Sequence, residues 1–203
     1  MQIKKRVINF LGFLFSFFLF LGFVPKQKNK VIDNFRLYST SGKWIELNEY
    51  RNCKGVIVVF TCNHCPFAKL YPGRLNELNK IYCAKGVPLI AISSTDSMLY
   101  EEDGYLQMAI KSKVEQFNFE YLTDATQVVA KQFNAQKTPH AFVLWRQENR
   151  WVIKYSGAID DNGSEPEKVE VPYVRNAVED LLAGKDPSIE DTKSIGCQIY
   201  FRK

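Results

Sequence analysis

A pair of cysteines between an apolar run and a helical pattern constrains this chain more than any other feature. Residues 56–60 read VIVVF, a β-branched run typical of a central strand that is covered on both faces. Cys62 and Cys65 follow at once, with His64 between them, in the segment FTCNHCPFAKL. Beyond the pair, apolar residues recur at helical spacing as far as Ile81, so the cysteines lie where a strand ends and a helix begins.

Three kinds of site contain two cysteines at this spacing. A closed zinc site needs four ligands, and the chain has only two histidines, His64 and His140, to complete one. A purely structural disulfide across two residues closes too small a loop to stabilise a fold by much. A redox pair at the start of a helix fits best. The other cysteines are single and widely spaced, which favours buried, unreactive thiols: Cys53, Cys83 and Cys197.

The redox interpretation predicts different roles for the two thiols. Cys62 is expected at the helix N-terminus, where unpaired N–H groups and the helix dipole stabilise a thiolate. Cysteines in such positions have pKa values of about 3.5–7.5 instead of about 8.5. Cys65, one turn further on, is expected to be the resolving thiol.

Elsewhere the patterns alternate between strands and helices. A hairpin is expected over 35–47, around a Ser-Gly turn, and Pro72-Gly73 predicts a break in the helix after the cysteines. Further strands are expected over 87–93, 140–145 and 151–157, and further helices over 124–134 and 171–184. Residues 97–119 are expected to be a polar stretch followed by an amphipathic helix. This order predicts an α/β sandwich with a mixed central sheet.

The N-terminal segment differs from the rest of the chain in charge and hydropathy. Residues 1–30 hold six of the 27 basic residues and no acidic one, whereas the remaining 21 are balanced by 22 acidic residues. A basic start followed by an apolar run predicts a signal anchor or signal peptide over 1–24. Residues 25–34 are expected to be a polar tether to a domain at 35–203. The protein is therefore expected to be exported to a compartment where disulfides form, and its balanced domain charge argues against nucleic-acid binding.

Four segments carry a family resemblance: CNHCPF, LTDATQVVAKQFNAQKTPHAFVL, GAIDDN and GCQIY. With them the chain from Val31 onward resembles the thioredoxin-like superfamily, in its redoxin branch of the alkyl hydroperoxide reductase and thiol-specific antioxidant type. The resemblance implies a thioredoxin-like three-layer sandwich with a central mixed sheet, an N-terminal hairpin and an inserted helical segment. Asp160 and Asp161 in GAIDDN are expected in a turn. Among the three single cysteines Cys197 is the exception, because the GC in GCQIY belongs to the pattern that carries the resemblance.

The resemblance also implies roles for particular residues. Thr138-Pro139 matches the cis-proline of the family, which faces the cysteine pair and binds the extended chain of a partner, so both residues are expected to bind substrate. His64 stands where strongly oxidising relatives carry a histidine that stabilises the thiolate. Val56 stands where thioredoxins carry a buried aspartate that moves a proton, which leaves the resolving thiol without a proton route.

These observations predict an exported thiol–disulfide oxidoreductase with a redox disulfide between Cys62 and Cys65. It is expected on the periplasmic face of a bacterial inner membrane, as a monomer without cofactor or metal. Its expected partners are protein dithiols and disulfides, together with an upstream redox partner. One alternative is a thiol peroxidase, although the Pro-x-x-x-Thr-x-x-Cys pattern of peroxidatic cysteines is absent. The other is a copper-handling module that uses Cys62, Cys65 and His140 as soft ligands.

Overall fold

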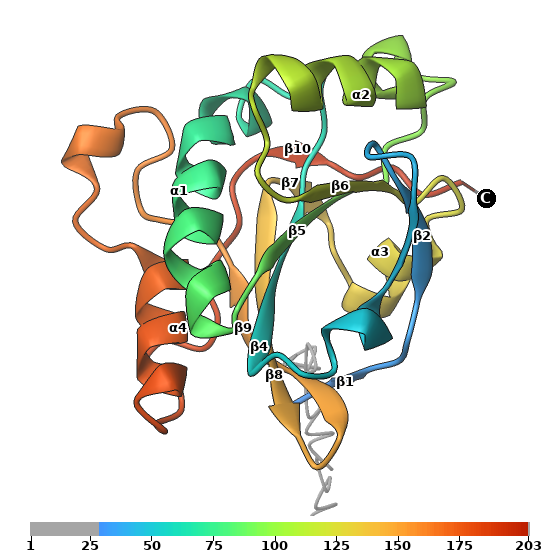
Figure 1. Cartoon of the computed structure of the whole chain (residues 1–203). Coiled ribbons are helices and arrows are strands. Elements are labelled where there is room, and N and C mark those ends of the chain that lie inside the picture. The colour runs from blue at the N-terminus through green and yellow to red at the C-terminus, as the bar shows by residue number, and fades with distance from the viewer. Residues whose placement is uncertain (1–28, 203) are drawn as a thin grey trace, which may run out of the picture.

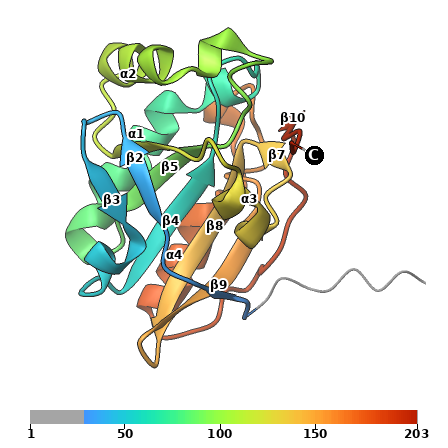
Figure 2. The same cartoon turned by 90° about the vertical axis from the view of Figure 1, so that its right-hand side faces the viewer.

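The computed structural model describes residues 29–202, which form a mixed sheet with helices on both faces (Figures 1 and 2). Within these residues eight strands pair in the order β1-β9-β8-β4-β5-β6-β2-β3, and β7 pairs with β10 in a second, small sheet. The strands are β1 Val31–Ile32, β2 Arg36–Ser39, β3 Trp44–Glu46, β4 Gly55–Phe60, β5 Leu89–Ser93, β6 Glu120–Thr123, β7 Lys137–Thr138, β8 His140–Gln147, β9 Arg150–Gly157 and β10 Cys197–Gln198.

The helices complete a layered α/β arrangement. Figure 1 shows α1 and α4 on one side of the sheet and α3 on the other, with α2 at the end of the molecule where β7 and β10 lie. The helices are α1 Pro72–Tyr82, α2 Tyr105–Val114, α3 Val128–Phe133 and α4 Tyr173–Leu182. Short 3-10 turns span Leu47–Tyr50, Ala68–Leu70, Cys83–Lys85, Glu101–Asp103 and Pro166–Lys168.

Strand β4 is the centre of the sheet and carries the cysteine pair at its end. All six of its residues are buried, and it pairs in parallel with β5 and antiparallel with β8. Because side chains alternate along a strand, Phe60 packs into the core beneath α3, whereas Val59 packs into the core beneath α1 and α4. Each fully buried side chain of this kind contributes about 1.5–3 kcal/mol, so β4 is a rigid support for the two cysteines.

Most of the predicted elements are confirmed, and two predictions are wrong. The described part of the expected tether, residues 29–34, belongs to the folded domain, because Val31 and Ile32 pair with β9 and Ile32 is buried. Strand β6 has no counterpart among the predicted strands. Its four residues directly follow the range 97–119, for which a polar stretch and a helix were predicted. The predicted signal segment 1–24 lies outside the described residues. Across residues 29–202, no helix combines the length and apolar character needed to cross a bilayer.

Candidate active site at the end of strand β4

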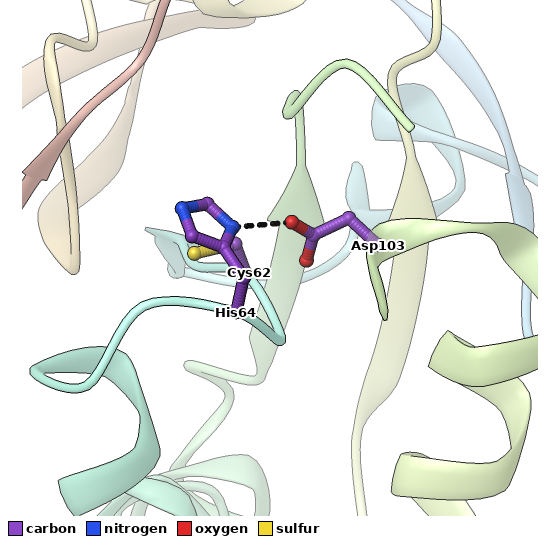
Figure 3. Close-up of side chains that lie close together, drawn as sticks. All are labelled: Cys62, His64 and Asp103. Carbon is purple, nitrogen blue, oxygen red and sulfur yellow. Dashed lines mark hydrogen bonds and ion pairs between the residues drawn. The ribbon is translucent and has the colours of Figure 1, made fainter. Parts of the chain in front are cut away.

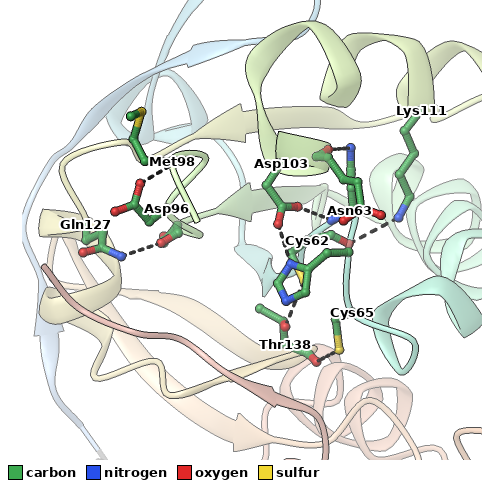
Figure 4. A network of polar contacts seen from close by, with 12 residues as sticks. Cys62, Asn63, Cys65, Asp96, Met98, Asp103, Lys111, Gln127 and Thr138 are labelled. Atoms are coloured by element: carbon green, nitrogen blue, oxygen red, sulfur yellow. Dashed lines mark hydrogen bonds and ion pairs between the residues drawn. The ribbon is translucent and has the colours of Figure 1, made fainter. Parts of the chain in front are cut away.

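Both predicted redox cysteines lie directly after β4 and contact one residue, Thr138 (Figure 4). Cys62 Sγ lies 3.1 Å from the Thr138 hydroxyl oxygen, and Cys65 Sγ lies 3.1 Å from the Thr138 carbonyl oxygen. Both cysteines are fully buried, and both are free thiols in this structure. The bond between Thr138 and Pro139 is cis, as the family resemblance implies. The structure therefore brings the four residues Cys62, Cys65, Thr138 and Pro139 together.

The first helical turn after β4 begins later than the sequence pattern suggested. The Lys69 N–H donates to the Cys65 carbonyl oxygen at 3.1 Å, which is the first helix-type hydrogen bond in this segment. The short 3-10 helix Ala68–Leu70 follows, with Phe67 as its capping residue, and the regular helix α1 starts only at Pro72. The prediction that Cys62 lies at a helix N-terminus is wrong, because neither helix begins before Ala68.

The two thiols share one hydrogen bond, so their pKa values move in opposite directions. A hydrogen bond from Cys62, aided by the Cys197 thiol and by the N–H groups of Ala68 and Cys197, lowers the pKa of Cys65 against the effect of burial. The contact with Cys65, burial and the Asp103 carboxylate raise the pKa of Cys62, and the Thr138 hydroxyl only partly offsets them. Ionisation of one thiol therefore favours retention of the proton on the other, and in this structure the Cys65 thiol donates to the Thr138 carbonyl oxygen.

A buried carboxylate that sequence reasoning missed lies beside the pair. Figure 3 shows the His64 imidazole directed at Asp103, with the Cys62 sulfur nearby. His64 Nδ1 lies 2.5 Å from Asp103 Oδ2, and the imidazole stacks on Tyr100 with the ring centroids 3.8 Å apart. The Asp103 side chain is fully buried. His64 is thus held by Tyr100 and Asp103, two residues of the segment 97–104 before α2, and its Nδ1 is hydrogen-bonded to the carboxylate.

The segment before α2 also holds the backbone of the loop between the cysteines. Asn63 N–H donates to the second oxygen of Asp103, and the Asn63 side chain donates to the Glu102 carbonyl oxygen at 2.7 Å. Lys111 on α2 donates to the Cys62 carbonyl oxygen at 3.3 Å, and burial lowers the pKa of this lysine. These contacts, visible in Figure 4, fix the position of the loop. Sequence reasoning treated the polar stretch before α2 as a connection, so it found none of them.

One group of side chains has the composition of a metal site. Among residues 29–202, only Cys62, His64 and Asp103 place three possible ligand atoms within 4.8 Å of one another. Histidine nitrogen and carboxylate oxygen bound to one tetrahedral zinc ion lie about 3.3 Å apart, given bond lengths of about 2.0–2.2 Å. The observed 2.5 Å between His64 Nδ1 and Asp103 Oδ2 is instead a hydrogen-bond distance.

His140 does not join the cysteines, so the predicted copper ligand set is wrong. Its Nδ1 accepts a hydrogen bond from the Gln136 N–H at 3.4 Å, and its Nε2 lies 3.2 Å from the Ser156 hydroxyl oxygen. Both ring nitrogens are therefore occupied by other groups of the chain. Burial lowers the pKa of His140 to about 4, which keeps the imidazole neutral at ordinary pH.

The acidic pair in GAIDDN has a structural role. Arg74 at the start of α1 donates to Asp160 at 2.8 Å and also to the carbonyl oxygens of Asn162 and Gly163. Tyr71 donates to the other oxygen of Asp160 at 3.1 Å. These bonds tie the loop after β9 to the start of α1.

Comparisons with known proteins agree with this geometry. The model of the AhpC/TSA family matches residues 29–161. A hypothetical protein from Sinorhizobium meliloti is 31% identical, with a TM-score of 0.78, over 86% of this chain and 94% of its own. An uncharacterized conserved protein from Geobacillus kaustophilus is also 31% identical, with a TM-score of 0.77, over 86% and 92%. No curated protein matches the chain.

A more distant structure shows the fold. The thioredoxin domain of a thiol-disulfide oxidoreductase from Bacteroides vulgatus is 17% identical, with a TM-score of 0.51, over 64% of this chain and 89% of its own. The predicted thioredoxin-like fold is therefore confirmed.

Proposed function

The chain belongs to the AhpC/TSA family, and on the geometry of its site we propose that it is a thiol–disulfide oxidoreductase that cycles between a Cys62–Cys65 disulfide and the dithiol. One observation carries this proposal. Two buried sulfurs contact the same residue next to a cis-proline, and their surroundings divide them into a thiolate and a thiol. A structural pair has no need of a charge on one sulfur, whereas disulfide exchange requires one, because the thiolate is the nucleophile.

The proposed reaction with a partner disulfide has two displacement steps. The Cys65 thiolate attacks one sulfur of the partner, a mixed disulfide forms, and the partner's other sulfur leaves as a thiolate. Cys62 then loses its proton and attacks Cys65 Sγ, which forms the Cys62–Cys65 disulfide and releases the partner's second sulfur. The cysteine pair is oxidised by two electrons and the partner disulfide is reduced by two. All steps run in reverse when the partner is a dithiol.

His64 and Asp103 supply a route for the Cys62 proton. Thioredoxins use a buried aspartate for this purpose, and Val56 stands at that position here. A ring nitrogen of His64 lies within 4.8 Å of Cys62 Sγ, and the hydrogen bond between Nδ1 and Asp103 orients the ring. We propose that His64 takes the proton of Cys62 when the disulfide closes, and that Asp103 positions His64.

A groove beside Pro139 is the proposed docking site for an extended partner chain. It encloses about 180 Å³ and its lining includes Phe67, Leu70, Pro139 and Ile195. Phe67, Leu70 and Ile195 are exposed apolar side chains, which suit an apolar stretch next to the partner's disulfide. Phe67 and Leu70 follow Cys65 closely in the chain, whereas Tyr100 and Asp103 contact His64.

The proposed place of action is the periplasmic face of the inner membrane. The basic and apolar pattern of residues 1–24 supports export to the periplasmic face of the inner membrane, where disulfides persist. A fusion of residues 1–34 to alkaline phosphatase, which is active only after export, tests this directly. An inactive fusion that is present at normal levels would contradict export.

Disulfide exchange with substituted variants tests the chemistry. The purified protein should accelerate the reduction of insulin by dithiothreitol, and Cys62→Ala and Cys65→Ala should each abolish this acceleration. Cys83→Ala is the matched control, because Cys83 is exposed and lies in the turn after α1. Full activity in either variant of the pair would overturn the proposal. Peroxide consumption faster than insulin reduction would instead favour a thiol peroxidase.

A further inference from the structure

The C-terminal tail returns to the cysteine pair and brings a third thiol to it. Strand β10 pairs antiparallel with β7, and the register places Cys197 opposite Thr138, the residue that contacts both sulfurs. Cys197 packs against the cluster formed by Cys62, Cys65 and Ala68. Residues separated by more than 130 positions in the sequence therefore share one site.

The tail is held in this place by several independent contacts. The Ile199 N–H donates to the Gln136 carbonyl oxygen at 2.8 Å, and the Ile199 side chain is buried. Gln127 donates to the Tyr200 carbonyl oxygen and accepts from the Arg202 N–H, both at 2.8 Å. Next to Cys197, a side chain at Gly196 would collide with the Thr138 carbonyl group. The glycine is what lets the tail approach the site this closely.

The three thiols differ in charge and in access to solvent. The Cys197 thiol donates to Cys65 Sγ, and the Cys197 N–H points to the same sulfur. Burial and the contact with Cys65 raise the pKa of Cys197, so it is a thiol at neutral pH. Cys62 and Cys65 are fully buried, whereas Cys197 is partly exposed, so of the three residues Cys197 is the most accessible to solvent.

We propose that Cys197 is a third redox-active cysteine, which exchanges with the Cys62–Cys65 disulfide to form a Cys65–Cys197 disulfide. This inference rests on the proposed function, which supplies the Cys62–Cys65 disulfide. The Cys197 sulfur attacks Cys65 Sγ, the Cys65–Cys197 bond forms, and the Cys62–Cys65 bond breaks. Cys62 leaves with the electron pair and takes up the proton that Cys197 gives up. The step is an isomerisation, so it needs no further oxidant, and it moves the disulfide from a buried to a partly exposed position.

Disulfides to Cys197 can be mapped, because trypsin places the Cys62–Cys65 pair, Cys197 and each of the other cysteines on different peptides. Residues 55–69 carry Cys62 and Cys65, residues 194–202 carry Cys197, and Cys53 and Cys83 fall in two short peptides elsewhere. A disulfide between 55–69 and 194–202 therefore reports a bond from the pair to Cys197. In the Cys62→Ala variant, this bond can involve only Cys65.

The test oxidises the reduced Cys62→Ala variant with oxidised glutathione, blocks free thiols and analyses the tryptic peptides by mass spectrometry. We expect peptide 55–69 linked to peptide 194–202 as the main product. The Cys62→Ala/Cys197→Ala variant should give only a glutathione adduct on Cys65, and Cys62→Ala/Cys83→Ala should retain the link. A glutathione adduct on Cys65 with Cys197 free in the Cys62→Ala variant would overturn the proposal.

The unsubstituted protein supplies a second measurement, which does not depend on whether a substituted protein folds. Oxidised protein equilibrated at pH 8 and quenched in acid should yield the peptide 55–69 to 194–202 link beside the internal Cys62–Cys65 disulfide. If the internal disulfide forms without any such link, this inference fails and the proposed function stands. If neither disulfide forms in a glutathione titration, the proposed function itself fails.

Discussion

The position of the negative charge in the dithiol form determines how the reduction potential depends on pH. Reducing a disulfide to two thiols takes up two protons, whereas reducing it to one thiol and one thiolate takes up one. Each proton changes the equilibrium constant tenfold per pH unit, which is about 30 mV for a two-electron couple. The slope of the potential against pH therefore counts the protons bound by the reduced pair.

The surroundings of the pair predict one proton over the neutral range. The pKa of Cys65 is lowered and the pKa of Cys62 is raised, because the two thiols share one hydrogen bond. The reduced pair is therefore expected to hold one thiolate and one thiol between pH 6 and 8. We expect the potential to fall by about 30 mV per pH unit in this range, against about 59 mV for a pair with two ordinary thiols.

Redox titration against dithiothreitol buffers at pH 6, 7 and 8, read out by alkylation and gel shift, measures this slope. Thiolate absorbance at 240 nm then counts the charge independently: the reduced protein at pH 7 should lose the absorbance of one thiolate when the Cys62–Cys65 disulfide forms. Alkylation rates are a poorer measure, since the nucleophilicity of a thiolate falls as its pKa falls. A slope near 59 mV per pH unit would show two thiols in the reduced pair and refute the charge assignment.

Three further predictions concern single side chains. Asp160→Asn should lower the free energy of unfolding in urea by about 1–3 kcal/mol, because it removes the counter-charge of the partly buried Arg74 guanidinium but leaves its bonds to the Asn162 and Gly163 carbonyl oxygens, and a loss below about 0.5 kcal/mol would contradict this. Folded His140 takes up a proton only near pH 4 and unfolded His140 near pH 6.5, so the protein should lose roughly 3 kcal/mol as pH falls between these values, a loss absent in His140→Gln. Asp103→Asn should slow insulin reduction and shift its pH profile while leaving the unfolding midpoint near that of the unchanged protein. A profile of unchanged shape would exclude positioning of His64 by Asp103.

The strands and the cysteine pair were predictable because their signals are local. An unbroken β-branched run such as 56–60 has few alternatives to a buried strand, and Cys-x-x-Cys at its end specifies the kind of site. The start of the helix was also encoded locally but was predicted too early. Pro72 suits the first position of a helix, and this signal would have placed the start of α1 there.

The residues around the pair could not be found in this way, because they come from distant parts of the chain. Asp103 lies 40 positions from the loop residue Asn63 that it binds, in a stretch whose acidic residues look like solvent-exposed ones. Nothing in that stretch indicates burial, since its partners are the backbone and His64 of another element. Cys197 was singled out only by the resemblance in GCQIY, and its contact with the pair was not predicted, because a short strand of two residues carries almost no pattern.

The charge on Cys65 also bears on the direction of electron flow. A lowered pKa of Cys65 stabilises the dithiol form at pH 7, and each pKa unit corresponds to about 1.4 kcal/mol, or about 30 mV toward a more oxidising pair. A thiol with a pKa near 7, as in thioredoxin, gains almost nothing from ionisation at the same pH. A pair whose reduction potential is raised in this way accepts electrons more readily than it donates them. If the third thiol then carries the disulfide to the surface, the protein is suited to oxidise dithiols of its partners. This direction is the opposite of the one used by a reductant such as thioredoxin, although the two share a fold.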